Sequence, residues 1–312
     1  MRKSFQDVFC RGFLKLFFAL LFVAFSATAN AAVLKPFVVY GTDDRIEVYE
    51  DNDPARRILA ESVVAIMGAE ALSANSTGGN NIKGEPYGEA NGLCTSEKFL
   101  DQSTPAYCSG FLVAENIIAT AGHCVEATDF CKDAKFVFGF MLDSKARDPN
   151  VVKIDDVYGC KRVLHGEVNN LGADFALVEL DRPVIGRKPL RFAKQLATTG
   201  DPVFVIGHPM GLPAKIAGGA NVRTVNNGFF MANLDTFGGN SGSAVFNHSY
   251  DVVGVLVRGE SDFARVGNCN VTNRCADDAC RGEDVTQASV VFDELEKQTK
   301  PLQLPQVVRT GP

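Results

Sequence analysis

The sequence lacks an excess of positive charge, with 31 Lys and Arg residues against 37 Asp and Glu residues. A protein that binds nucleic acid or an anionic membrane usually carries a basic surface, so this balance argues against both partners. The sequence also lacks a long apolar run. Its apolar run Leu16–Phe25 has ten residues, whereas a membrane-spanning helix needs about 20. We therefore expect a protein that binds no nucleic acid and has no stable membrane association.

The N-terminus has the features of a secretory signal peptide. Basic residues come before the apolar run, and Ala29-Asn30-Ala31 fits the small-residue pattern of a cleavage site. We expect residues 1–31 to be removed and residues 32–312 to be secreted, to the outside of the cell or to the periplasm. An uncleaved membrane anchor is the alternative. Cleavage would leave 27 Lys and Arg residues against 36 Asp and Glu residues, so the mature chain is more acidic still.

The late cysteines lack the paired Cys-x-x-Cys spacing that is typical of a structural zinc site. Of the nine cysteines, Cys10 falls in the signal peptide, and the even number that remains suggests disulfides in an exported chain. Three of the eight lie late, at positions 269, 275 and 280. Because three is odd, full pairing requires at least one bond from this group to the earlier part of the chain. We expect disulfides and no metal site, with zinc as the poorer alternative.

Short runs of β-branched and aromatic residues alternate with Gly, Asn, Asp and Pro along the chain. This is the pattern of strands and turns in an all-β barrel or sandwich. The predicted strands include Ser62–Met67, Gly110–Val113, Ile117–Ala119, Lys135–Phe140, Ala176–Leu180, Val203–Ile206, Ser243–Phe246 and Val252–Val257. Residues 69–104 differ, since they are rich in Ser, Gly and Asn with little strand character. We expect a solvated surface insertion there, with a binding element as the alternative.

The end of the chain has a different periodicity. Ala288, Val291, Phe292 and Leu295 recur at the spacing of one face of an α-helix. We therefore predict a C-terminal helix after the β-rich part of the protein.

A serine lies between glycines in Gly238-Gly239-Asn240-Ser241-Gly242. Glycine tolerates positive φ and lets a substrate approach the backbone closely. A tight turn of this kind also directs N–H groups at one point, where an oxyanion can bind. His123, in the segment Thr120–Cys124, is a candidate base that would activate the serine, and Asp174 is a candidate acid to orient it. The other histidines lack flanking motifs, and we expect His208 to be structural.

The order His123, Asp174, Ser241 and the segments around these residues resemble chymotrypsin-like serine proteases, and within them the bacterial glutamyl-endopeptidase branch. The resemblance runs from about Val38 to the end of the chain. The matching segments are Gly41–Arg45, Cys108–Gly110, Thr120–Cys124, Asp174–Leu177 and Leu234–Ser243.

This resemblance implies a fold and a set of site residues. The fold would be all-β, with two antiparallel Greek-key β-barrels, at about 60–185 and about 190–300, and a C-terminal helix. His123, Asp174 and Ser241 would form the catalytic triad, and the N–H groups of Gly239 and Ser241 would form the oxyanion hole. The resemblance also implies a disulfide between Cys108 and Cys124. No cofactor is expected.

The resemblance places Asp235, Thr236, Leu256 and Arg258 in the substrate pocket. An aspartate six residues before the serine favours Lys or Arg substrates, but Asp235 also fits the glutamyl branch. Leu256 occupies the place where that branch has a histidine that recognises glutamate. Arg258 could pair with an acidic side chain or be a surface arginine. We therefore expect a preference different from a strict glutamate preference, either for Lys and Arg or broad.

The sequence thus predicts a secreted serine endopeptidase that acts, as a monomer, on protein or peptide substrates. The alternative is a protease-like binding or toxin-associated protein with little turnover. A third hypothesis is that the chain is a disulfide-stabilised structural domain.

Overall fold

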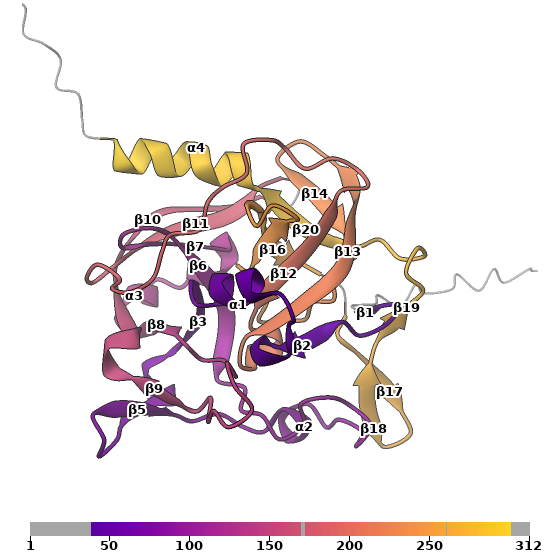
Figure 1. Cartoon of the computed structure of the whole chain (residues 1–312), viewed down its shortest axis with the longest axis horizontal. Helices are drawn as coiled ribbons and strands as arrows, with labels where there is room; N and C mark the ends of the chain where they lie inside the picture. The colour runs from indigo at the N-terminus through magenta and orange to yellow at the C-terminus, as the bar shows by residue number, and fades with distance from the viewer. Residues whose placement is uncertain (1–38, 170–171, 260, 301–312) are drawn as a thin grey trace, which may run out of the picture. The chain divides into compact units, whose positions relative to one another are not determined.

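The computed structural model describes residues 39–169, 172–259 and 261–300, which lie within one structural unit, Lys35–Pro312. The predicted signal peptide lies outside the described residues. Strands dominate the described part of the chain, and two of the sheets are closed barrels (Figure 1). No helix among the described residues is long and apolar enough to cross a membrane.

The first barrel has strand order β10-β11-β7-β6-β3-β8, and every neighbouring pair is antiparallel. Aromatic side chains such as Phe111, Phe136 and Phe175 fill its interior and are fully buried. Its strands are β3 (Val63–Gly68), β6 (Ala106–Ala114), β7 (Ile117–Thr120), β8 (Ala134–Phe138), β10 (Val157–Val168) and β11 (Asp174–Leu180).

The second barrel has strand order β12-β15-β16-β20-β14-β13 and is closed by the pairing of β12 with β13. Its strands are β12 (Pro202–Gly207), β13 (Lys215–Val225), β14 (Phe229–Ala232), β15 (Ala244–Asn247), β16 (Val252–Arg258) and β20 (Glu283–Gln287). In both barrels the third strand along the chain pairs with the sixth, which is a Greek-key connection. The predicted fold class is therefore confirmed.

The predicted C-terminal helix is α4 (Ala288–Thr299). Ala288, Val291 and Leu295 are buried, as the periodicity predicted, but the Phe292 side chain is 43% exposed. Phe292 instead packs edge-on against Phe192, with ring centroids 5.9 Å apart. The helix therefore covers the barrels with a narrower apolar face than the sequence pattern suggests.

Residues 69–104 are mostly exposed or half-buried, as expected for a surface insertion, but they contain more regular structure than their composition suggested. They contain η2 (Ala69–Ala71), β4 (Leu72–Ala74), β5 (Gly79–Ile82) and α2 (Tyr87–Ala90). Strand β5 pairs with β9 (Val151–Lys153), and the Tyr87 side chain is fully buried. The polar composition of the segment reflects short strands joined by tight turns, a pattern that lacks the apolar alternation of a core strand.

The remaining elements are short and connect or flank the barrels. They are β1 (Val39–Tyr40), β2 (Arg45–Glu47), η1 (Val48–Glu50), α1 (Pro54–Ala60), η3 (Gly122–Val125), α3 (Phe130–Asp133), η4 (Ile154–Asp156), η5 (Pro209–Gly211), β17 (Phe263–Val266), β18 (Cys269–Thr272) and β19 (Arg274–Cys275). Strand β2 adds to the second barrel beside β13, so the start of the described chain is fixed against that barrel.

Four disulfides hold these elements together. The bridges are Cys94–Cys269, Cys108–Cys124, Cys131–Cys160 and Cys275–Cys280. The pairing of Cys108 with Cys124 agrees with the family resemblance. The bond from the 69–104 segment to Cys269 is the expected link between a late cysteine and the first half of the chain.

We expect the double variant Cys108→Ala/Cys124→Ala to lose about 3 kcal/mol of unfolding free energy, because the bridge restricts the unfolded chain. It spans 16 residues, whereas the Cys275–Cys280 bridge spans 5. The matched control Cys275→Ala/Cys280→Ala should therefore lose less, about 2 kcal/mol. Unfolding in guanidinium chloride without reductant measures both losses. A larger loss from the shorter loop would contradict this explanation.

Candidate active site

His123 and Asp174 are brought together by two neighbouring strands of the first barrel. His123 lies in η3, directly after β7, and Asp174 is the first residue of β11, which pairs with β7. The His123 Nδ1 atom is 2.9 Å from Asp174 Oδ2. The other carboxylate oxygen accepts hydrogen bonds from the backbone N–H groups of Gly122 and His123. With Nδ1 donating to the carboxylate, Nε2 is left as the basic nitrogen of the ring.

Ser241 lies on a tight turn of the second barrel that is pressed against the first barrel. Gly239 and Gly242 on either side of it have φ of +82° and +90°, a conformation that favours glycine. A Cβ atom at position 242 would overlap the carbonyl oxygen of Ser109. The Ser109 N–H donates to the Ser241 carbonyl at 2.8 Å, and Cys124 Sγ lies 3.7 Å from the same oxygen. Because Cys124 follows His123 in the chain, the serine turn lies beside the histidine.

The turn also provides backbone donors. Within the part of the chain that the structure describes, the N–H groups of Gly239 and Ser241 donate to no protein acceptor. The Gly238 carbonyl, in the same peptide plane as the Gly239 N–H, accepts from the Met210 N–H at 2.5 Å. The Asn240 carbonyl, in the plane of the Ser241 N–H, accepts from the Ser243 N–H at 2.8 Å, so both peptide planes are fixed. Fixed, unoccupied N–H groups beside a serine are the arrangement that stabilises an oxyanion.

The buried histidine His208 does not take part in this arrangement. It is 1% exposed, stacks on Phe140 and has its Nδ1 atom 3.0 Å from the Leu212 carbonyl. Burial lowers the pKa of His208 to about 4, so its ring is neutral at physiological pH. This agrees with the structural role that the sequence indicated.

The sulfurs of Cys108 and Cys124 lie close to the His123 ring, a grouping that could suggest a metal site. The two sulfurs are bonded to each other in a disulfide, so neither is a thiolate that could bind a metal. One histidine alone does not make a site of the usual three or four ligands.

A cavity of about 200 Å³ opens beside Ser241. Thr236, Leu256 and Arg258 line it, as the family resemblance predicted. The other lining residues are Phe237, Gly238, Val257, Gly259, Asp262 and Glu283.

The predicted place of Asp235 in this cavity is wrong. Its side chain is 3% exposed, and its carboxylate oxygens accept hydrogen bonds from the backbone N–H groups of Tyr40 and Asp44, each at 2.8 Å. Burial raises the pKa of Asp235 to about 7, although these two hydrogen bonds act in the opposite direction. The carboxylate therefore anchors the first described strand, which the sequence did not reveal because the anchoring groups are backbone atoms.

Two other carboxylates line the cavity, and the sequence analysis missed both. Glu283 is 1% exposed and accepts hydrogen bonds from the hydroxyl groups of Tyr40 at 3.0 Å and Thr236 at 2.9 Å. A Cβ atom at position 259 would overlap Glu283 Oε2, so Gly259 is needed for this placement. Burial raises the pKa of Asp262 to about 6, and its carboxylate faces the N–H group of Gly238. For Glu283, the sequence signal was the mainly polar segment 283–287 ahead of the predicted helix, and this segment does not include Asp262.

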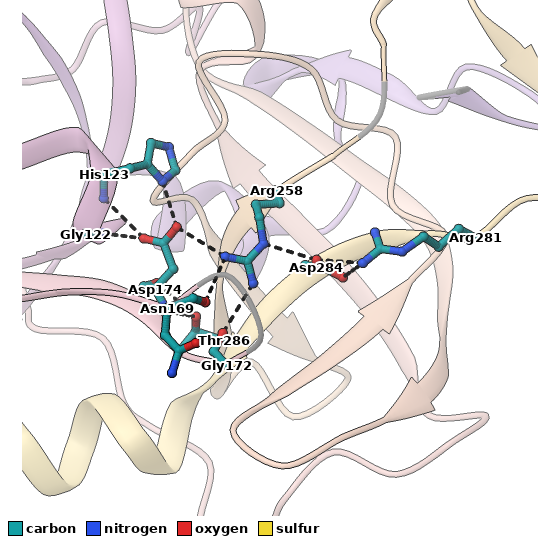
Figure 2. Close-up of polar contacts among 9 residues, drawn as sticks. All are labelled: Gly122, His123, Asn169, Gly172, Asp174, Arg258, Arg281, Asp284 and Thr286. Atoms are coloured by element: carbon teal, nitrogen blue, oxygen red, sulfur yellow. Dashed lines mark hydrogen bonds and ion pairs between the residues drawn. The ribbon is translucent and has the colours of Figure 1, made fainter. Parts of the chain in front are cut away.

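Arg258 is not available to bind an acidic substrate side chain, which corrects one of its two predicted roles. Figure 2 shows its guanidinium group turned toward Asp174 and Asp284. Its other donors reach the carbonyl oxygens of Asn169 and Gly172. Among the described residues that line the cavity, Arg258 is the only cation, so the cavity presents carboxylates rather than positive charge.

Comparison with known proteins supports this description. Residues 108–255 match the family model described as a trypsin-like peptidase domain. The resemblance to trypsin-like serine proteases that the motifs predicted is therefore confirmed. No match is found among curated protein sequences.

Solved structures with a similar course of the chain are also found. A Glu endopeptidase structure is 20% identical, with 84% of this chain and 100% of that chain covered and a TM-score of 0.49. A serine endoprotease from Yersinia pestis is 15% identical, with 78% of this chain and 65% of that chain covered and a TM-score of 0.47.

Proposed function

We propose that this chain is a secreted serine endopeptidase that cleaves peptide bonds through Ser241, His123 and Asp174. The observation that carries the proposal is the hydrogen-bonded pair of His123 and Asp174 beside a glycine-flanked serine turn. The match to the trypsin-like peptidase domain covers all three residues. An export destination is supported by the four disulfides, which form and persist in oxidising compartments.

In this proposal Ser241 Oγ attacks the peptide carbonyl while His123 Nε2 takes the hydroxyl proton. The negative charge that develops on the carbonyl oxygen is stabilised by the N–H groups of Gly239 and Ser241. The C–N bond then breaks, the amine leaves with the proton from His123, and the acyl group stays on the serine. Water, activated by the same histidine, hydrolyses the ester. Asp174 keeps the ring oriented and stabilises its positive charge.

The proposal extends to the side chain that the cavity accepts. Carboxylates of Asp262 and Glu283 line the space beside Ser241, and the lining arginine is held by other groups. A Lys or Arg side chain would gain charge-assisted hydrogen bonds there, whereas a glutamate would face like charge. We therefore infer that the enzyme cleaves after basic residues.

Reaction with an organophosphorus serine reagent tests the proposal. We expect a single covalent adduct on Ser241, found by mass spectrometry of the digested protein, because only an activated serine reacts readily with such a reagent. The same preparation should hydrolyse a denatured protein substrate, and the labelled preparation should not. The alternative, a binding protein with little turnover, predicts no hydrolysis even if labelling occurs. An absence of both labelling and hydrolysis would contradict the assignment of the nucleophile.

A further inference from the structure

The Asp174 carboxylate is almost fully buried, with 2% of its side chain exposed. A buried carboxylate needs close hydrogen-bond donors and a cation to offset its lost hydration. Two backbone N–H groups and the His123 ring supply the donors. Among the described residues, Arg258 is the only Lys or Arg that pairs with it, with Nη1 3.6 Å from Oδ2. This is the same oxygen that faces His123 Nδ1.

The Arg258 guanidinium group is itself held from several sides (Figure 2). Its Nε donates to Asp284 Oδ2 at 3.2 Å, and Asp284 also accepts from Arg281. Nη1 and Nη2 donate to the carbonyl oxygens of Asn169 at 3.3 Å and Gly172 at 3.2 Å. With these acceptors around it, the planar group has little rotational freedom.

The two carbonyl acceptors belong to residues that come shortly before Asp174 in the chain. The Gly172 N–H donates to the Asn169 carbonyl, and the Asn169 N–H donates to the Ala173 carbonyl. Arg258 thus contacts both the carboxylate and the backbone that carries it. A second link reaches the same aspartate from β20, because the Thr286 hydroxyl bonds to its backbone N–H and carbonyl.

Arg258 also belongs to the strand that supports the nucleophile. It is the last residue of β16, and Leu256 of that strand bonds to Gly242 and Ser243 just after the serine. Asp174, by contrast, belongs to the first barrel. Arg258 therefore joins the strand that supports Ser241 to the residue that orients His123.

We propose that Arg258 is a positioning residue that fixes the Asp174 carboxylate, and through it the His123 ring, relative to Ser241. The inference rests on the proposed function, because it takes His123 as the catalytic base. A positioning role differs from substrate recognition in its kinetic effect. It should change kcat, since the reacting groups are misaligned, while substrate binding in the cavity stays the same.

The test compares two variants. Arg258→Met removes the positive charge and the hydrogen-bond donors, whereas Arg258→Lys keeps the positive charge but replaces the planar guanidinium group by a single ammonium group. We expect Arg258→Met to lower kcat by about 100-fold, because a displacement near 1 Å in a catalytic group has an effect of this size. KM should stay within about twofold, and Arg258→Lys should recover part of kcat. The matched control is Arg191→Met, at an exposed surface ion pair, which should leave kcat unchanged.

A second measurement does not depend on turnover. The proton that His123 donates to Asp174 should give a low-field NMR signal, assigned by its absence from His123→Ala. We expect Arg258→Met to shift or broaden this signal. If Arg258→Met does not fold, Asp284→Asn serves instead, since it removes the carboxylate that holds the arginine Nε. Asp284→Asn should lower kcat by about tenfold, as expected for a smaller displacement.

Several outcomes would overturn the inference. One is an unchanged kcat together with an unchanged NMR signal in a folded variant. Another is a raised KM with normal kcat, which would make Arg258 a substrate-binding residue. Failure of the proposed function would look different: the wild-type protein would neither hydrolyse peptides nor react at Ser241, while the NMR signal would still report whether Arg258 positions the pair.

Discussion

Replacement of Ser241 by Ala should lower kcat for peptide hydrolysis by about 10⁶-fold, the effect of removing the nucleophile from a triad that acts as a unit. The protein should stay folded, because the turn is held by backbone bonds and by Gly239 and Gly242 rather than by the serine hydroxyl. Steady-state kinetics and thermal unfolding measure the two effects. Ser249→Ala, at an exposed surface serine, is the matched control and should behave as wild type.

The same mechanism predicts that the losses of kcat from Ser241→Ala and His123→Ala are not additive. His123→Ala should reduce kcat by a similar amount, and the double variant Ser241→Ala/His123→Ala should be little worse than either single variant. The histidine acts only by moving the serine proton, so it has no further effect once the hydroxyl is gone. Fully additive losses would show that the two residues do not share one step. Near-normal activity of Ser241→Ala would show that another group is the nucleophile.

Peptides that differ only in the residue before the scissile bond should be cleaved with a kcat/KM at least 100-fold higher for Lys and Arg than for Glu. A charge-assisted hydrogen bond contributes about 1.5–3 kcal/mol, and like-charge contact costs several more. The carboxylates of Asp262 and Glu283 provide this difference, while Arg258 is engaged with Asp174 and Asp284.

Glu283→Gln should reduce this selectivity by about tenfold or more, mainly through a lower kcat/KM for Lys and Arg peptides. Glu296→Gln, on α4 at an exposed ion pair with Lys300, is the matched control and should keep the selectivity. Asp235→Asn should lower stability and affect all peptides alike, since this carboxylate anchors Tyr40 and Asp44 outside the cavity. A strong preference for Glu, or selectivity that is unchanged in Glu283→Gln, would refute the pocket assignment.

Most of the barrel strands could be predicted from the sequence, because their buried faces require β-branched and aromatic residues in short runs. Ser62–Met67 and Val252–Val257 correspond closely to β3 and β16. The missed strands have a different composition. Strand β10 is mostly exposed or half-buried along its length, and β13 is interrupted by two glycines. Neither has the apolar run by which a strand is recognised.

Strand β20 is the clearest case of an element that could not be predicted from the sequence pattern. Its residues, Glu283–Gln287, are mainly polar, yet every one is buried. They are buried because their polar groups form hydrogen bonds with residues elsewhere in the chain. Glu283 accepts from Tyr40, Asp284 accepts from Arg258, and Thr286 donates to the Asp174 carbonyl. Burial of a polar side chain is acceptable only when such partners exist. These partners lie far away in the sequence, so a local pattern gives no sign of them.

The residues of the candidate triad were chosen from the sequence alone, because a serine between glycines that can adopt positive φ has a local signature at Gly239 and Gly242. The order of His123, Asp174 and Ser241 in the chain supplied the other two residues through the family resemblance. Which charged residues line the cavity was decided only by the tertiary structure. Asp235 had the expected position in the chain but turned to backbone donors, while Glu283 reached the cavity from a distant strand. The physical reason is that a local turn fixes the position of a nucleophile, whereas the charge of a cavity depends on which side chains the tertiary structure places around it, and those side chains come from segments distant in the sequence.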